Sequence, residues 1–357
     1  MKKLNIPINK GNYNMESPER QILFQKHLSE GWEDKYKEYR ANWIKYAKEK
    51  IVSEYPLLVD IELSTVCNLK CPMCYTITDE YKKKINAEFI DFELFKKIID
   101  EIAGKVPAIR LSLRGEPTLH PEFAECAKYA KEKGINEIST LTNASKLTDE
   151  YFEKIMLAGV DWITISIDGL NENYENVRKP LKFLDTLQKI KNIKAIKEKN
   201  NSNKPVIKVQ GIWPAIKENP EAYYNTFEPY VDGIAFNPLI DYLDKDEDII
   251  YDEDFSCPQH YQRIIIAVDG YAMMCSNDQK GLEIVGDANN QTIYEIWHGE
   301  KLKRMRNIHK KQCGFKEIPV CKNCYLPRLT EDSETAEVNG RKFIIKNYVN
   351  RKQEIGQ

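Results

Sequence analysis

The sequence predicts an α/β fold in which six β-strands alternate with helices along the middle of the chain. Short apolar runs rich in β-branched residues recur there, and amphipathic segments of helical length separate them. This alternation indicates βαβ units and a parallel sheet, because parallel neighbours need a long crossover that is usually a helix. The 357 residues suffice for one large domain with an appendage or for two domains.

Each expected strand is a run of apolar residues bounded by turn-forming residues. The expected strands are 57–63, 108–113, 137–141, 162–167, 206–212 and 233–236. The expected helices carry apolar residues at three- and four-residue spacing. They span 92–102, 121–133, 148–158, 180–199 and 219–230. Functional sites of parallel sheets form at the carboxyl ends of the strands, so the residues that follow each strand are the candidates for function.

The composition excludes several classes of protein. Hydrophobic residues make up 42% of the chain, the formal net charge is −2, and no basic patch typical of nucleic-acid binding is present. We expect no membrane segment, because the N-terminus lacks the apolar core of a signal peptide and no apolar run is long enough to span a bilayer. Most of the nine cysteines stand at metal-ligand spacings. We therefore expect a cytoplasmic protein that binds metal in a reducing compartment.

Three cysteines directly after the first strand are the most informative residues. Cys67, Cys71 and Cys74 follow the pattern Cys-x3-Cys-x2-Cys. Three such thiolates can hold one face of a 4Fe–4S cluster, which a fourth cysteine would normally complete. The next cysteine, Cys126, lies far along the chain in a helical segment. One iron is therefore expected to be open to a small molecule. The alternative is a zinc site, but zinc prefers four ligands drawn from paired units.

This pattern, preceded by residues 60–63 and followed by Tyr75, resembles the signature of the radical S-adenosylmethionine (SAM) superfamily. The resemblance implies a partial (βα)6 TIM-like barrel and a cluster whose open iron binds SAM. It also implies reductive cleavage of SAM to methionine and a 5′-deoxyadenosyl radical, which removes a hydrogen atom from the substrate. In such a reaction the cofactors carry the chemistry, and the protein orients them and excludes water. The implied reductant is a flavodoxin or ferredoxin.

Residues 114–117, Arg-Gly-Glu-Pro, follow the second strand and resemble the family's Gly-Gly-Glu-Pro motif. The resemblance implies that Gly115 and Glu116 hold the amino group of SAM. Arg114 replaces the first glycine, and it is a candidate to reach the SAM carboxylate or the substrate. Alone the tetrapeptide would be weak evidence, since glycine and proline occur in many loops.

Further SAM contacts are implied at the ends of the next strands. The resemblance assigns them to Tyr75, Asn143, Ser166, Arg178 and Gln210. An arginine suits the SAM carboxylate because a guanidinium forms two parallel hydrogen bonds with it. The alternatives are a turn cap for Asn143 and an exposed helix residue for Arg178.

A second set of cysteines follows the barrel: Cys257, Cys275, Cys321 and Cys324. The segments 264–269 and 271–274 read as a hairpin with an Asp-Gly turn, which would bring the first two together. A helix over 293–307 would return the chain to the closing pair. By ligand type the four cysteines suit a 4Fe–4S cluster or zinc equally. Their resemblance to the SPASM/twitch extension of radical SAM enzymes implies a small C-terminal iron–sulfur domain with one auxiliary 4Fe–4S cluster.

The expected organisation has four parts. They are an N-terminal helical extension (1–56), the radical SAM partial barrel (57–240), a linker with the twitch/SPASM-like domain (241–330) and a C-terminal tail (331–357). Aromatic residues from Trp32 to Trp43 lie on one helical face, which we expect to dock on the barrel. Residues 342–349 could form a strand. Cys126 is expected to be a buried helix residue, and Cys313 is either inert, an alternative ligand or a hydrogen-atom donor.

Three functions are compatible with these features. The first is oxidation of a small polar substrate such as a sugar, aminocyclitol or nucleotide sugar, with the auxiliary cluster accepting an electron. The second is modification of a peptide, or a redox-neutral epimerisation. The third is a non-enzymatic iron–sulfur or zinc protein, which the nearly complete set of SAM-binding motifs disfavours.

Overall fold

A single ten-stranded sheet organises most of the chain in the computed structural model, which describes residues 13–241, 243, 245–351 and 355. The strand order is β1-β7-β6-β5-β4-β3-β2-β8-β9-β10. Six neighbouring strands run parallel to one another, as the sequence predicts. They are β2 (Leu58–Ile61), β3 (Ala108–Arg110), β4 (Glu137–Thr142), β5 (Trp162–Ser166), β6 (Val206–Ile212) and β7 (Gly233–Asn237). The fold is the predicted partial TIM-like barrel.

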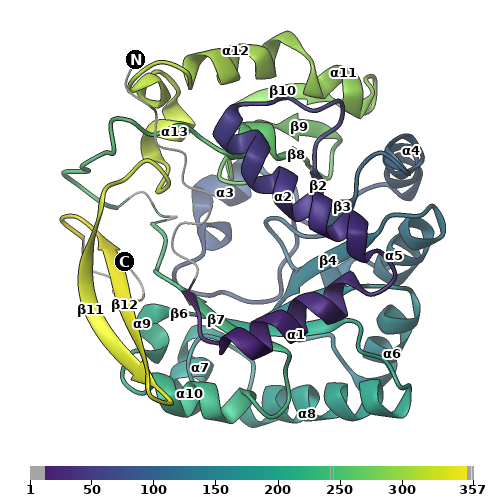
Figure 1. The fold of residues 1–357 in the computed structure, drawn as a ribbon, viewed down its shortest axis with the longest axis vertical. Coiled ribbons are helices and arrows are strands. Elements are labelled where there is room, and N and C mark those ends of the chain that lie inside the picture. The colour runs from purple at the N-terminus through teal and green to yellow at the C-terminus, as the bar shows by residue number, and fades with distance from the viewer. Residues whose placement is uncertain (1–12, 242, 244, 352–354, 356–357) are drawn as a thin grey trace.

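Helices cover the outer face of these strands (Figure 1). Each expected helix between the strands is present within a few residues of its predicted bounds. They are α4 (Phe92–Ile102), α5 (Phe123–Glu132), α6 (Asp149–Leu157), α8 (Phe183–Lys199) and α10 (Pro220–Phe227), with the shorter α3 (Asp79–Lys84), α7 (Asn171–Val177) and α9 (Trp213–Ile216). In α4, Asp91 caps the first turn, and Phe95, Ile98, Ile99 and Ile102 are buried in the core.

The N-terminal helices α1 (Pro18–Ser29) and α2 (Glu33–Glu49) cross in front of the strands in Figure 1. The aromatic stripe docks α2 as predicted, because Trp32, Tyr39 and Trp43 pack with Leu57, Leu58 and Ala108 at the start of β2 and β3. A short strand, β1 (Tyr13–Asn14), pairs antiparallel with β7 and was not foreseen.

The C-terminal part extends the same sheet. The predicted hairpin is present as β8 (Arg263–Ile266) and β9 (Tyr271–Met273), followed by β10 (Ile284–Asp287). The predicted helical stretch over 293–307 is present, but it is broken into α11 (Ile293–Trp297) and α12 (Glu300–Ile308). The chain turns at Gly299, which is extended and packs closely on the carbonyl of Glu295. Arg306 donates to the carbonyl of Trp297, which replaces the helical partner lost at the break.

The last elements are α13 (Pro319–Asn323) and a separate hairpin, β11 (Thr330–Val338) with β12 (Arg341–Tyr348). The strand expected over 342–349 corresponds to β12, whereas its polar partner β11 was not foreseen. The hairpin packs beside α10, and Trp213 donates its indole N–H to Glu334 at 3.1 Å. In the part of the chain that the structure describes, no helix combines the length and apolar content needed to cross a bilayer.

Glu137, at the start of β4, is a buried carboxyl group inside the sheet. Its pKa rises to about 7, chiefly through desolvation and against the nearby charge of Arg40. Ionisation therefore destabilises the fold, and this penalty grows as the pH rises from about 4.3 in the unfolded chain through 7. We predict that Glu137→Gln is more stable than the wild type by about 2–3 kcal/mol at pH 8 and nearly equal at pH 5. Denaturant unfolding at both pH values measures this, with the exposed Glu132→Gln as control; equal effects at the two pH values would contradict it.

Candidate metal centres

The first cysteine site is the loop that leaves the carboxyl end of β2. Cys71 is buried, and Cys67 and Cys74 are partly exposed. The Cys74 backbone N–H donates to the Cys71 carbonyl at 3.0 Å, which closes a tight turn between them. Leu69 and Met73 anchor the loop in a small apolar cluster. Three thiols are thus held on one loop at the edge of the sheet where sites form.

Burial raises the pKa of the Cys71 thiol to about 11 and raises that of Cys67 as well. The charge of Cys74 also raises the pKa of each of these two thiols, which indicates that the three sulfurs lie near one another. Arg178 opposes the rise at both. Metal binding requires thiolates, and a cationic iron cluster would supply the charge that deprotonates them. The donor set therefore fits an iron–sulfur cluster at this loop.

Backbone hydrogen bonds connect the loop after β3 to the start of the cysteine loop. Gly115 donates its N–H to Ser64 O at 3.2 Å, and Glu116 donates to Val66 O at 2.8 Å. A Cβ atom on Gly115 would lie 2.4 Å from Ser64 O, so only glycine allows this approach. The glycine of the motif therefore positions the cysteine loop.

Arg114 does not point to a free site. Its Nε donates to Glu62 Oε1 at 2.6 Å, its Nη2 pairs with Glu62 Oε2, and both side chains are buried. The role toward SAM or the substrate that the sequence suggested for Arg114 is therefore wrong, because its guanidinium pairs with Glu62, just after the end of β2. The buried pair joins β2 to the loop after β3.

The carboxylate of Glu116 joins two strand ends. Its Oε1 accepts from the Thr118 and Thr142 hydroxyls, both at 2.6 Å, and its Oε2 accepts from the Asn143 N–H at 2.7 Å. Oε2 keeps an acceptor position beyond these bonds. The Asn143 side chain donates to Asn68 in the cysteine loop and lies 4.0 Å from Cys67 Sγ. The structure thus brings Glu116 and Asn143 to the cysteine loop.

Arg178, at the end of α7, is paired with Asp168 at 2.6 Å and faces Cys71. It is not an exposed helix residue, because it is held over the cysteine loop by this carboxylate. Asp168 also accepts from the Ile212 N–H at 3.1 Å, which ties β5 to β6. Ser166 and Gln210 lie opposite each other in the register of these strands. Asp168 is a site residue that sequence reasoning missed, although its place directly after β5 marked it.

Tyr75 begins a short helical turn, η1 (Tyr75–Ile77), immediately after Cys74. Its ring meets Tyr81 edge-to-face at 5.5 Å, and burial raises its pKa. Tyr75 therefore lies beside the cysteine loop, as the motif predicts.

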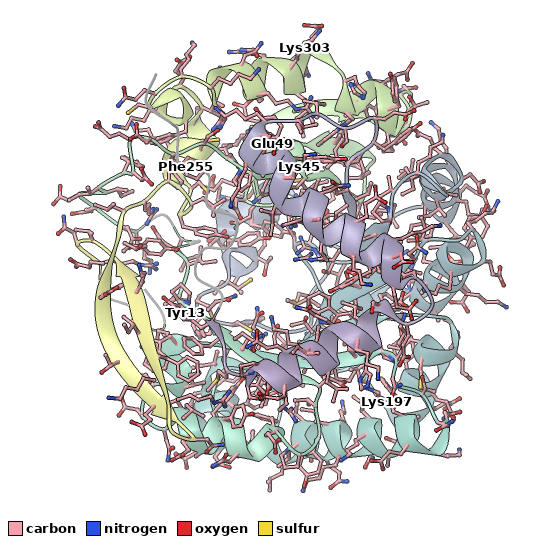
Figure 2. All side chains as sticks on the ribbon, viewed as in Figure 1. Tyr13, Lys45, Glu49, Lys197, Phe255 and Lys303 are labelled. Carbon is pink, nitrogen blue, oxygen red and sulfur yellow. The ribbon has the colours of Figure 1, made fainter. Side chains whose placement is uncertain are left out.

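The second cysteine site is a cage that gathers four distant residues. Cys257, Cys275, Cys321 and Cys324 line one small cavity, which Phe255 and Leu326 help to enclose. Phe255 is labelled in Figure 2, and its ring packs on Phe315 at 5.7 Å and on His309 at 6.2 Å. Burial raises the pKa of the Cys257 thiol to about 12, and the pKa values of Cys275 and Cys321 rise as well.

The cage supplies N–H donors as well as sulfur. Cys324 Sγ accepts from the Asn277 side chain at 3.3 Å and from the Leu326 N–H at 3.4 Å. Such N–H···S bonds stabilise the charge on cluster thiolates and tune their potential. Among the described residues, no group of three or more His, Cys, Asp or Glu side chains is close enough to hold a single metal ion. The all-thiol set with its N–H donors fits an iron–sulfur cluster.

His309 is a further member of the cage that sequence reasoning missed. Its Nδ1 accepts from the Cys257 backbone N–H at 3.4 Å, and burial lowers its pKa to about 4. The neutral ring therefore carries its proton on Nε2, which lies 3.4 Å from Cys321 Sγ and donates to it. No spacing in the sequence joined this histidine to the cysteines, because it follows the last residue of α12 and lies twelve residues before Cys321.

The two remaining cysteines lie apart from both sites. Cys126 is fully buried on α5, as predicted. Cys313 precedes the helical turn η4 (Gly314–Glu317), and its thiol lies 3.7 Å from the Glu253 carbonyl. It does not line the cage of the second site.

A large cavity fills the interior of the barrel, which we call the lumen. Its volume is about 390 Å³. The walls are alternate residues of the strands, such as Ser139, Thr164, Lys208 and Gln210, together with α2. Gln259 and Leu326 close it on the side of the second cysteine site.

Comparison with known proteins agrees with this geometry. Residues 61–228 match the Radical SAM superfamily, and residues 257–325 match SPASM, an iron–sulfur cluster-binding domain. The chain is 28% identical over 261 residues to the tungsten-containing aldehyde ferredoxin oxidoreductase cofactor-modifying protein of Pyrococcus furiosus, covering 70% of this chain and 71% of that protein. It is 34% identical over 124 residues to the AdoMet-dependent heme synthase of Methanosarcina barkeri, about a third of each chain.

Solved structures share the fold. BtrN in complex with AdoMet and 2-DOIA superposes with a TM-score of 0.55 at 17% identity, over 77% of this chain and 94% of that chain. The enzyme anSMEcpe with bound AdoMet gives 0.54 at 14% identity, over 75% and 85%.

Fold and sites together define a radical SAM enzyme. Within that superfamily, the chain belongs to the proteins that carry a SPASM iron–sulfur domain. The predicted cofactors are confirmed at this level: a radical SAM 4Fe–4S cluster, SAM and an auxiliary iron–sulfur cluster.

The His309 contact generates a prediction. An N–H···S bond stabilises the reduced, more negative cluster, so its loss lowers the midpoint potential. A difference of about 1 kcal/mol between the two redox states corresponds to about 40 mV for one electron. We predict that His309→Leu lowers the potential of the auxiliary cluster by roughly this amount, measured by redox titration with electron paramagnetic resonance (EPR). His298→Leu, on the exposed end of α11, is the control; an unchanged potential in His309→Leu would contradict the contact.

Proposed function

We propose that this enzyme oxidises a small polar substrate, such as a sugar or nucleotide sugar, by two electrons. In this proposal Cys67, Cys71 and Cys74 ligate the radical cluster. SAM is held by Tyr75, Gly115, Glu116, Asn143, Ser166, Arg178 and Gln210. Hydrogen bonds to the cysteine loop support Gly115, Glu116 and Asn143, and Ser166 and Gln210 are neighbours in the strand register. The auxiliary cluster, ligated by the four cysteines of the cage, accepts one electron.

One observation carries the proposal: the lumen borders the four-cysteine cage and also reaches Gln210, a proposed SAM contact. Gln210, on the SAM side, lines it at one end. Gln259 and Leu326 line it at the other, and the same two residues also line the four-cysteine cage. A substrate in the lumen would therefore lie between the source of the radical and an electron acceptor. That arrangement suits a reaction that loses two electrons.

The atoms and electrons of this oxidation balance. When bound, the cluster and SAM supply the 5′-deoxyadenosyl radical that takes one hydrogen atom from a carbinol carbon. The hydroxyl proton then needs a base. Water in the open lumen accepts it, because the carboxyl group of Glu137 lies at the start of β4, six residues before Asn143 and far from the proposed SAM contacts. The remaining electron leaves toward the cage, and a carbonyl group is formed.

A redox-neutral epimerisation has less support. It needs a hydrogen-atom donor beside the substrate, and Cys313 was the candidate. The Cys313 thiol contacts the Glu253 carbonyl, outside the lining of the lumen. Peptide modification remains the second alternative, and no contact in the structure favours it over a small molecule.

The proposal includes a flavodoxin or ferredoxin as the reductant, a cytoplasmic location, and no nucleic-acid or membrane partner. It also keeps the expected division of the chain into a helical extension, the barrel to 240, the linker with the auxiliary domain to 330, and a tail.

Iron, sulfide and zinc content after anaerobic reconstitution tests the two-cluster basis. We predict about eight irons and little zinc in the wild type, about four irons when Cys67, Cys71 and Cys74 are all changed to Ala, and about four when Cys257 and Cys275 are changed to Ala. Cys313→Ala is the control and keeps the full content. About four irons with one zinc in the wild type would remove the electron acceptor and contradict the oxidative function.

A further inference from the structure

The lumen carries more positive than negative charge. Its charged side chains, counted over the described residues, are the four cations Arg40, Arg110, Lys208 and Arg263 and the carboxyl groups of Glu137 and, behind the two strand arginines, Asp60. Glu137 is ionised only in part near neutral pH, because its pKa is about 7. An excess of at least two positive charges therefore faces the space where the proposed substrate would lie.

The arginines of the strands have a local partner. Arg110 pairs with Asp60 at 2.7 Å, and Arg263 pairs with the same carboxylate at 3.2 Å. One carboxylate between two guanidinium groups holds β3 and β8 to β2. Arg110 and Arg263 therefore have a structural role, and the excess positive charge of the lumen lies on Arg40 and Lys208.

Lys208 is different. In the described part of the chain its ammonium group has no ion pair and no hydrogen-bond partner. It lies over the ring of Trp162, 5.9 Å from the ring centroid. Desolvation alone lowers its pKa to about 8, with no nearby carboxylate to offset the cost. Lys208 is half-buried and lines the lumen, so an anion in the lumen could pair with it and offset this desolvation.

Its position suits a substrate group. Lys208 stands two residues before Gln210 on β6, so their side chains face the same side at about 6.6 Å spacing. Thr164 and Gly233 lie opposite Lys208 in the register, and the ring of Phe24 packs over Gly233. The indole N–H of Trp162 is buried and has no acceptor among the described residues. Lys208 therefore lies one pleat step below the level of Ser166 and Gln210, and Trp162 lies one step further down.

We propose that Lys208 and the Trp162 N–H bind an oxyanion, a phosphate or carboxylate group, that the substrate carries. This inference rests on the proposed function in taking the lumen as the substrate chamber. It favours a phosphorylated sugar or a nucleotide sugar over an aminocyclitol, whose ammonium groups the lumen would repel. The carbon that reacts would then lie above Lys208, toward Gln210.

The test is anion binding to the reconstituted full chain, without turnover. Thermal unfolding is followed in inorganic phosphate and in malonate, against chloride at equal ionic strength. Phosphate stabilises proteins in general because it is excluded from their surface, and this general rise of the unfolding midpoint is the same in all variants. We expect a further saturable rise of the midpoint by about 2 °C in the wild type and in the control Lys128→Met, which changes an exposed lysine of α5. Lys208→Met should lose it, and Trp162→Phe should need a several-fold higher concentration to reach it.

Each outcome decides the matter. A saturable response to phosphate alone assigns a phosphate group, and an equal response to malonate assigns a carboxylate. A response that Lys208→Met keeps, or a wild type that responds no more than the variant, overturns the inference. Iron content is measured on the same samples. Full iron without anion binding rejects this inference alone, whereas zinc in place of the second cluster rejects the oxidative function and leaves the anion site standing.

Discussion

The parallel pairing of β2 with β8 is the constraint on which the rest of the structure depends. β2 carries the chain into the Cys67 loop, and β8 belongs to the hairpin between Cys257 and Cys275. Four residue pairs join the two strands, from Leu58 with Arg263 to Ile61 with Ile266. The auxiliary domain is therefore a continuation of the barrel sheet, and the two cysteine sites are fixed relative to each other by backbone hydrogen bonds.

Buried charges on β2 reinforce this arrangement. Asp60 reaches Arg110 on β3 and Arg263 on β8, and Glu62 holds Arg114 in the loop after β3. Buried ion pairs add little net stability, but breaking one leaves a costly unpaired charge. They therefore specify which strands meet. β2 thus pairs with β3 and β8 in the sheet, carries buried charges and leads into the cysteine loop. The lumen is left free for a substrate.

The sequence was enough for the barrel strands, the radical cluster loop and the four cysteines of the cage, because apolar periodicity and ligand spacing are local signals. It was not enough for the break at Gly299, where Arg306 replaces a helical hydrogen bond across the turn. Arg114 was placed wrongly, because its partner Glu62 lies 52 residues earlier in the chain. His309 and Lys208 gain their roles only from tertiary neighbours, which no spacing in the sequence reveals, whereas the place of Asp168 directly after β5 was a signal that the sequence did offer.

The central claim is that this one chain holds two clusters with different ligand sets, and that one of them binds SAM. Mössbauer spectroscopy of protein reconstituted with iron-57 tests this most directly. We predict that SAM changes the Mössbauer signal of a single iron site, at the cluster with an open position, and leaves the signal of the auxiliary cluster unchanged. A spectrum that does not respond to SAM, or one in which both clusters respond, would contradict it.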